Sequence, residues 1–212
     1  MKVITGTFRD KRGSEPIEIQ TDGTCLTVVI RGVTFEGSDF DSLGTSEETG
    51  QFDLCRGDLY ACDFSVSIPV RLETPDGIRE VGMSAFVSIG ELNAYGWPAP
   101  GDLRLHLEQP EFSIPSRGTS GAFEDEMLSI VSKLPQGFQL HACITCGLSD
   151  YSPAGSMSFG NMACFRDVPD EYRKVKSKSD IFALWDQLTD YVQETHYCPK
   201  FEKRPKGTGY RG

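Results

Sequence analysis

Four cysteines in the last third of the chain have the type and spacing of metal ligands. Cys143 and Cys146 lie in the sequence CITCG, and Cys164 and Cys198 follow as single residues. A C-x2-C step followed by glycine forms a tight turn in which two thiolates face one ion while backbone N–H groups donate to the sulfurs. Two further thiolates complete a tetrahedral set. The sequence therefore predicts a zinc ion bound by these four cysteines.

Zinc held by four thiolates has no open position for water or substrate, so the predicted site stabilises the fold and performs no chemistry. Two alternatives remain open, namely thiols without a ligand and a redox pair formed by Cys143 and Cys146. A redox pair is expected at a helix N-terminus, which lowers thiol pKa values. Here Gly147 and a loop rich in Ser, Pro and Gly follow the motif, so structural zinc is the favoured interpretation.

Two histidines lie close to the cysteines in sequence. His141 precedes Cys143 by two residues, and His196 precedes Cys198 by two. Residues two apart in an extended strand share a face, so either imidazole could replace a cysteine as a ligand. We favour either a supporting role, in which each histidine donates a hydrogen bond to the site from outside the coordination sphere, or simple packing on the strand.

Sequence motifs for catalysis are absent from the chain. It contains no G-x-S-x-G, no GxxxxGK[ST] and no H-E-x-x-H. Asp150 and Tyr151, in the SDYSP segment after the C-x2-C motif, are the residues we expect nearest to any functional cleft. The alternative is an ordinary turn in which Asp150 accepts hydrogen bonds from local amides.

Charge is distributed unevenly along the 212 residues. The net charge is -10, and residues 1–165 carry 11 Lys and Arg against 23 Asp and Glu, whereas residues 166–212 carry 10 against 8. An acidic body repels phosphate backbones and favours a basic partner protein. The acidic residues concentrate in residues 36–63, the acidic segment. The basic, aromatic tail, residues 200–212, is the one part of the sequence suited to nucleic acid, although we favour a terminal segment that packs back on the acidic body or stays mobile.

Alternation of apolar residues predicts seven strands in the first half of the chain. The breaker sequence TPDG at residues 74–77 predicts a hairpin between two of them. The fold class is therefore mainly β with some helix (α+β), either an antiparallel sandwich or a partly open barrel. The predicted strands are residues 3–8, 17–20, 26–35, 51–54, 60–72, 79–89 and 103–114.

Two amphipathic helices are expected at residues 121–134 and 179–194. Thr119 or Ser120 would cap the first helix, and Ser177 or Ser179 the second. Strands at residues 137–146 and 159–166 are expected to form a zinc-knuckle hairpin. We divide the chain into a β body, residues 1–118, and a helix and zinc-knuckle region, residues 119–212, that packs on the body as one unit.

The odd number of cysteines and the absence of a long apolar run or signal peptide predict a cytoplasmic protein that makes no membrane contact. Seven cysteines cannot all pair, which fits a reducing compartment where thiols bind metals or pack in cores.

Several unusual elements in residues 138–212 resemble a family of bacterial proteins of unknown function. These elements are CITCGLSDYSPAGSMSFGNMACFR, DEYRKVKSK and QETHYCPKFEKRPKGTGYRG. The resemblance implies a bacterial cytosolic origin and brings no established activity.

These observations together predict a zinc-stabilised, acidic binding or adaptor protein, such as an immunity-like protein that neutralises a basic toxin. One alternative is an enzyme with an active site near the SDYSP segment. Another is a thiol-based sensor of redox state or metal.

Overall fold

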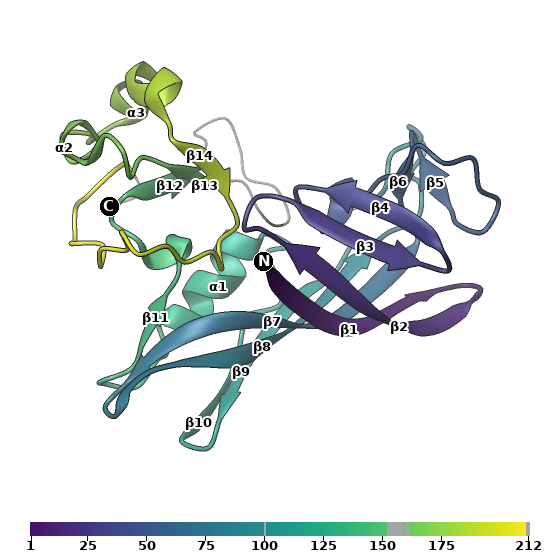
Figure 1. Cartoon of the computed structure of the whole chain (residues 1–212), viewed down its shortest axis with the longest axis horizontal. Coiled ribbons are helices and arrows are strands. Elements are labelled where there is room, and N and C mark those ends of the chain that lie inside the picture. The colour runs from purple at the N-terminus through teal and green to yellow at the C-terminus, as the bar shows by residue number, and fades with distance from the viewer. Residues whose placement is uncertain (100, 152–158, 160–161, 211–212) are drawn as a thin grey trace.

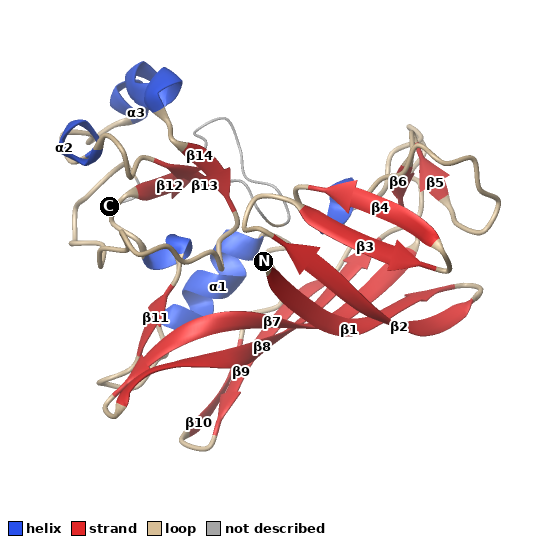
Figure 2. Cartoon of the chain, in the orientation of Figure 1, coloured by secondary structure: helices blue, strands red, loops and turns tan. Residues whose placement is uncertain are grey.

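Antiparallel strands form most of the regular structure (Figure 2). The computed structural model describes residues 1–99, 101–151, 159 and 162–210. Strands account for 43% of residues and helices for 14%, so the prediction of a mainly β protein is confirmed.

A large sheet of nine strands runs through the molecule in the order β10-β9-β8-β7-β1-β2-β3-β4, with β11 paired to β7 (Figure 1). Strands β10 and β4 stand at opposite ends of this order, so the described sheet is open and not a closed barrel. Its members are β1 (Lys2–Asp10), β2 (Gly13–Thr21), β3 (Leu26–Ile30), β4 (Val33–Gly37), β7 (Cys62–Thr74), β8 (Gly77–Ile89), β9 (Leu103–Gln109), β10 (Phe112–Pro115) and β11 (Gln139–His141).

The longest hairpin, β7 with β8, forms where TPDG predicts it. Its register runs from Cys62 opposite Ile89 to Thr74 opposite Gly77. The Thr74 hydroxyl donates to the Gly77 carbonyl at 2.8 Å and accepts from the Asp76 N–H at 3.2 Å, which closes the turn. Alternate residues of both strands are buried, as a half-covered sheet requires.

Two of the predicted strands are hairpins in the structure. The segment 26–35 divides into β3 and β4 at Arg31 and Gly32, which have φ values of 48° and 82°. A two-residue turn with both φ values positive matches the twist of the strands that flank it. Segment 103–114 also divides into two paired strands, β9 and β10, although its turn residues Pro110 and Glu111 have no positive φ. Of segment 51–54 only Leu54 is in a strand, because β5 (Leu54–Cys55) pairs with β6 (Asp58–Leu59).

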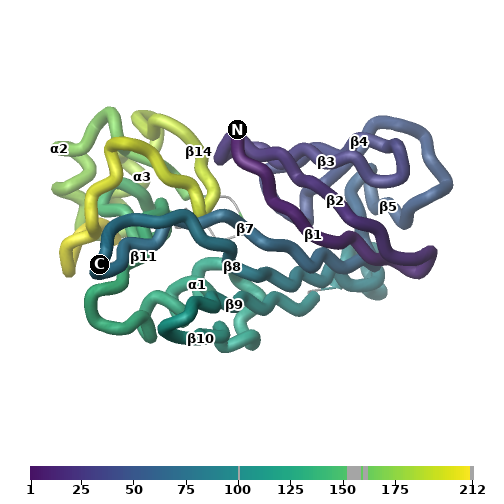
Figure 3. Tube along the Cα trace, turned by 60° about the horizontal axis from the view of Figure 1, so that its bottom comes forward, coloured from purple at the N-terminus to yellow at the C-terminus, as the bar shows by residue number. Residues whose placement is uncertain are grey.

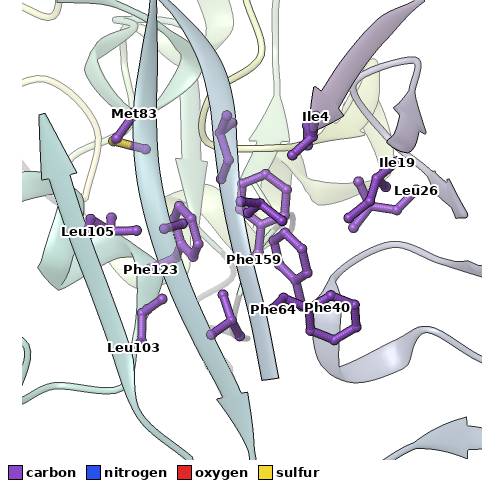
Figure 4. Close-up of a cluster of buried hydrophobic side chains, with 14 of the residues drawn as sticks. Ile4, Ile19, Leu26, Phe40, Phe64, Met83, Leu103, Leu105, Phe123 and Phe159 are labelled. Carbon is purple, nitrogen blue, oxygen red and sulfur yellow. The ribbon is translucent and has the colours of Figure 1, made fainter. Parts of the chain in front are cut away.

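A cluster of buried side chains fills the space between the large sheet and the first helix (Figure 4). Phe40 contacts Phe64 and Phe159 with ring centroids 5.4 Å apart in each pair, and Phe159 lies 4.5 Å from Phe123 of the helix. Each such ring contributes about 1.5 to 3 kcal/mol by burial. Phe123 and Phe159 therefore join the later part of the chain to the same core as the early strands, while the division at residue 118 stays a prediction.

The described residues contain three α-helices, and the two that were predicted are shorter than expected. The three are α1 (Phe123–Val131), α2 (Pro169–Tyr172), which was not predicted, and α3 (Lys178–Leu184). Ser177 caps α3, and it is one of the two residues predicted as the cap of this helix. The residue before α1 is Ala122, whose side chain makes no capping hydrogen bond, so the predicted caps Thr119 and Ser120 are wrong. No helix in the described residues is long and apolar enough to cross a membrane.

The second half of the predicted helix 179–194 is instead a short 3-10 turn and a strand, β14 (Asp190–Val192). This strand joins β12 (Ser149–Tyr151) and β13 (Met162–Cys164) in a small sheet with the order β12-β13-β14. The predicted hairpin between 137–146 and 159–166 does not form, because β11 pairs with β7 while β13 pairs with β12 and β14. Figure 3 shows α2 and α3 beside this small sheet.

Candidate functional site

The four cysteines of the predicted metal site lie around the small sheet. Cys143 begins a 3-10 turn that Cys146 follows, which together with residues 144 and 145 we call the cysteine turn. Cys164 ends β13, and Cys198 comes after β14. Cys143, Cys146 and Cys164 are buried, Cys198 is half-buried, and all four are free thiols.

Backbone hydrogen bonds bring the segment that carries Cys198 onto the cysteine turn. The N–H of Cys143 donates to the carbonyl of His196 at 2.7 Å, and the N–H of Ile144 donates to the carbonyl of Glu194 at 3.0 Å. Cys164 lies opposite Ser149 in the small sheet. Ser149 follows Cys146 by three residues, so Cys164 lies near the end of the cysteine turn. Segments that are far apart in sequence therefore deliver the cysteines to one region.

Two of the sulfurs accept hydrogen bonds from N–H groups two residues later in the chain. The Leu148 N–H donates to Cys146 Sγ at 3.4 Å, and the Arg166 N–H bonds to Cys164. The guanidinium of Arg166 also donates to Cys164 Sγ, at 3.5 Å. Donation of this kind stabilises metal-bound thiolates.

The thiols also interact electrostatically. Burial raises the pKa of Cys143 well above its usual value, and the charges of Cys146, Cys164 and Cys198 raise it further. Burial is also the largest cause of the raised pKa values of Cys146 and Cys164, although N–H donors oppose it. Cys143 thus lies within electrostatic range of the other three thiols, and burial favours the neutral form of Cys143, Cys146 and Cys164.

Among the described residues, no group of three or more His, Cys, Asp or Glu side chains is arranged so that it could hold a metal ion. The side-chain geometry therefore adds no support to zinc binding by Cys143, Cys146, Cys164 and Cys198, which stays a prediction.

The two histidines lie in different surroundings. His141 Nε2 bonds to Glu73 Oε2 at 2.7 Å, and its ring stacks on Phe201 with centroids 4.5 Å apart. His196 is half-buried against the turn after β2, where a Cβ atom on Gly23 would lie 2.0 Å from its Nδ1. Burial lowers the pKa of His196, and the positive charges of Lys2 and Arg166 lower it further, which favours a neutral imidazole.

Asp150 and Tyr151, the predicted cleft residues, are buried within hydrogen-bond networks. Asp150 Oδ2 accepts from the hydroxyl of Tyr172 at 3.0 Å and from the N–H of Tyr210 at 3.2 Å. The Tyr151 hydroxyl donates to Glu194 Oε1 at 2.8 Å. Residues 152 and 153 of the SDYSP segment lie outside the described residues.

Some acidic residues of the acidic segment are exposed, whereas others are buried or paired with basic side chains. Asp39 is fully buried, and Asp53 forms salt bridges with Lys11 at 2.9 Å and Arg12 at 3.1 Å. The exposed acidic residues of the segment are Glu36, Asp41, Glu47 and Glu48. Of these, the three glutamates form no salt bridge within the part of the chain that the structure describes, so their negative charge is available to solvent.

The basic tail packs back on the small sheet. Lys200 forms a salt bridge with Asp167 at 2.9 Å. Arg204 donates to the carbonyls of Thr208, at 2.8 Å, and of Ser149. Part of the tail's positive charge is thus used within the protein. The supporting roles of Arg166 and Arg204 were missed in the sequence, although the position of Arg166 two residues after Cys164 is a usable signal.

Comparison with protein families finds a match over the N-terminal and central part of the chain. The predicted family resemblance over residues 138–212 is not supported, because the family match ends at residue 149. No curated protein and no solved structure matches the chain. The chain belongs to a family of unknown function (DUF6304), which matches residues 2–149.

Proposed function

We propose that this protein is a cytoplasmic binding or adaptor protein, in which a sandwich-like β body presents an acidic surface to a basic partner protein and a structural zinc ion fastens the C-terminal region. An immunity-like protein that neutralises a basic toxin is one such binder. The observation that best supports the zinc site is geometric: Cys143, Cys146 and Cys164 are buried, and backbone hydrogen bonds from the cysteine turn to Glu194 and His196 bring the segment of Cys198 onto it.

A zinc ion would compensate the free-energy cost of placing four thiolates close together in a buried site. Burial favours the neutral thiols, whereas zinc binds thiolates at about 2.3 Å and compensates their charge. The N–H donors at Cys146 and Cys164 would remain bonded to the metal-bound sulfurs. Binding requires the cysteine side chains to move together into a tetrahedron. The raised pKa values of Cys143 and Cys146 weigh against a redox sensor, because oxidation begins from a thiolate.

Elemental analysis of the purified protein tests the zinc site. We expect about one zinc per chain after expression in zinc-supplemented medium, and loss of that zinc when any one of the four cysteines is replaced by serine. Cys25→Ser and Cys55→Ser are matched controls, because these two thiols lie outside the cluster, and both should keep the metal. A wild-type protein without zinc, or retention of zinc by every variant, would reject the site.

The proposed docking surface is the exposed part of the acidic segment. Glu36, Glu47 and Glu48 are exposed, and the net charge of residues 1–165 is strongly negative. Such a surface speeds the approach of a basic partner and rejects acidic ones.

Binding of a lysine-rich peptide, measured by fluorescence anisotropy between low and physiological salt, tests this surface. We expect the double variant Glu47→Gln/Glu48→Gln to weaken binding several-fold at low salt and to reduce its salt dependence. Glu18→Gln/Glu108→Gln removes the same charge from exposed positions of the large sheet and should have a smaller effect. Equal losses from the two double variants would show that the acidic segment is not the docking surface.

A further inference from the structure

A cavity of about 200 Å³ lies where the start of β1, the turn after β2 and the chain after β14 meet. Figures 1 and 3 both show the start of β1 beside the end of β14. The N–H of Gln193 donates to the carbonyl of Gly23 at 2.7 Å and closes one side of the cavity. Parts of the chain that are nearly two hundred residues apart therefore line one partly open cavity.

Two hydrogen-bond donors on the residues that line this cavity lack partners. Lys2 Nζ and Gln193 Nε2 are both buried, and neither has a hydrogen-bond partner within the described residues. Gln193 as a whole is only 1% exposed. A buried donor without a partner is costly, and a buried ammonium group more so, so the two together indicate that something is missing from this space.

The orientation of the Gln193 amide is fixed by its neighbours. The Thr21 hydroxyl accepts from the Gly23 N–H at 2.9 Å and donates to Gln193 Oε1 at 2.8 Å. Reversing the amide would leave the Thr21 hydroxyl proton without an acceptor. The amide therefore keeps its N–H2 group as the free end, and the missing partner must be a hydrogen-bond acceptor.

Lys2 Nζ also forms no salt bridge within the described residues, so no carboxylate of the chain neutralises it at close range. Burial lowers the pKa of Lys2, while the more distant charges of Glu80 and Cys143 raise it and that of Arg71 lowers it. Asp22 lines the cavity too, but its Oδ1 already accepts hydrogen bonds from the N–H groups of Thr24 and Cys25, at 2.8 and 2.9 Å.

The remaining wall is largely apolar, since Ile4, Ile68 and Pro69 line the cavity. A space of about 200 Å³ corresponds to roughly six water molecules at about 30 Å³ each, and hence to a molecule of about six non-hydrogen atoms. The cavity thus combines two donors with a small apolar chamber.

We propose that this cavity binds a small organic carboxylate. Its oxygens accept hydrogen bonds from Lys2 Nζ and Gln193 Nε2 after small side-chain rotations, and its short hydrocarbon chain packs against Ile4, Ile68 and Pro69. The site is independent of zinc and of the acidic surface, so it stands or falls separately from the proposed function.

Isothermal titration calorimetry of the full chain with butyrate tests the site. We expect 1:1 binding with a submillimolar Kd, and at least tenfold weaker binding of butyramide, which has the same shape without the charge. Lys2→Met and Gln193→Leu should each weaken butyrate binding at least tenfold. Lys11→Met removes an exposed lysine at the far end of β1 and should change the Kd less than twofold.

The thermal midpoint of each variant without ligand separates binding from folding. Lys2→Met should melt no lower than the wild type, because it removes a buried charge without a hydrogen-bond partner. The proposal is overturned if butyrate does not bind, if inorganic phosphate binds in its place, or if Lys2→Met binds butyrate as the wild type does. It is also overturned if Lys2→Met loses zinc while butyrate affinity is unchanged, since Lys2 would then serve as the counter-charge of Cys143.

Discussion

Asp39 is a carboxyl group that the fold holds away from water. It precedes the 3-10 turn Phe40–Ser42, and its Oδ1 accepts from the Ser42 N–H at 2.8 Å. Its side chain is fully buried. Burial, followed by the adjacent Asp41, raises the pKa of Asp39 to about 8, so the neutral acid is the form that the folded protein favours at neutral pH.

Asp39→Asn should remove a pH dependence from the stability of the protein. The pKa of an unfolded aspartate is about 3.9, so the folded state retains a proton that the unfolded state loses between about pH 4 and 8. Stability from this group is therefore fully present below about pH 4 and is lost, by up to about 1.4 kcal/mol per pH unit, as the pH rises towards 8. Urea unfolding at pH 5, 6, 7 and 8 should show a flatter profile for Asp39→Asn than for wild type. The exposed substitution Asp102→Asn should leave the profile unchanged, and parallel profiles for all three proteins would contradict the prediction.

Gly23 allows the close approach of His196 to the turn after β2. Its φ is +99°, and an added Cβ would lie 2.0 Å from His196 Nδ1. Gly23→Ala should destabilise the protein by about 1 to 3 kcal/mol more than Gly13→Ala. Gly13 also has a positive φ, of +135°, but its Cβ would meet nothing within 4 Å, so the comparison isolates the clash. Equal losses in thermal denaturation would place His196 farther from the turn.

At the scale of elements, α1 depends on a carboxylate inside the helix. Glu126 Oε1 accepts from the N–H groups of Thr119 and Ser120, at 3.1 and 2.9 Å, and Oε2 accepts from the N–H of Gly118. Burial opposes the charge of Glu126, but hydrogen bonds from the side chains of Ser116 and Ser120, and from the N–H groups of Gly118 and Ser120, outweigh it and lower its pKa to about 2. Glu126 thereby fixes the loop before the helix. Thr119 and Ser120, the predicted caps, donate to Glu126 and do not cap the helix themselves.

Glu126→Gln should destabilise the protein by about 2 to 3 kcal/mol at pH 7, because an amide presents an N–H2 group to some of these donors. A lowered pKa contributes stability above about pH 4.5, the value of an unfolded glutamate, and that stability is lost as the pH falls towards 2. The difference between wild type and Glu126→Gln in urea unfolding should therefore shrink between pH 5 and pH 2.5. Glu108→Gln, at an exposed position of β9, should show no such difference.

The elements that were predicted well are those with two agreeing local signals. Residues 77–89 combine alternation with TPDG, and β8 covers this range. The turn at Arg31 was missed because a non-glycine residue takes the first positive φ. Residues 188–192 were assigned to a helix because their apolar spacing suits both periods, and only pairing with β13 decides for the strand.

At the scale of the whole molecule, the four cysteines could be selected by spacing, whereas the cavity could not. Cys143 and Cys146 are adjacent in a recognisable motif. Lys2 and Gln193 become neighbours only because the chain after β14 docks on the turn after β2, and no local pattern records that contact.

If the proposed zinc ion is bound, its removal should affect the small sheet more than the large sheet. Structural zinc sites contribute about 10 to 16 kcal/mol in apparent binding free energy, so a strong chelator should unfold at least the small sheet and α3. Hydrogen exchange should then rise in β12, β13 and β14 before it rises in β7 and β8, and Cys25→Ser should respond as wild type does. A uniform rise across the large and small sheets, or none, would contradict this expectation.

The contact between Thr21 and Gln193 spans 172 positions of the chain, and its consequence is kinetic. To form this contact the chain must first lose the entropy of closing a long loop. Only then do the stabilising contacts form, which makes folding slow. During synthesis the edge at Gly23 stays uncovered until residue 193 has left the ribosome. We therefore expect a late folding step in which the completed body waits for its last segment to dock.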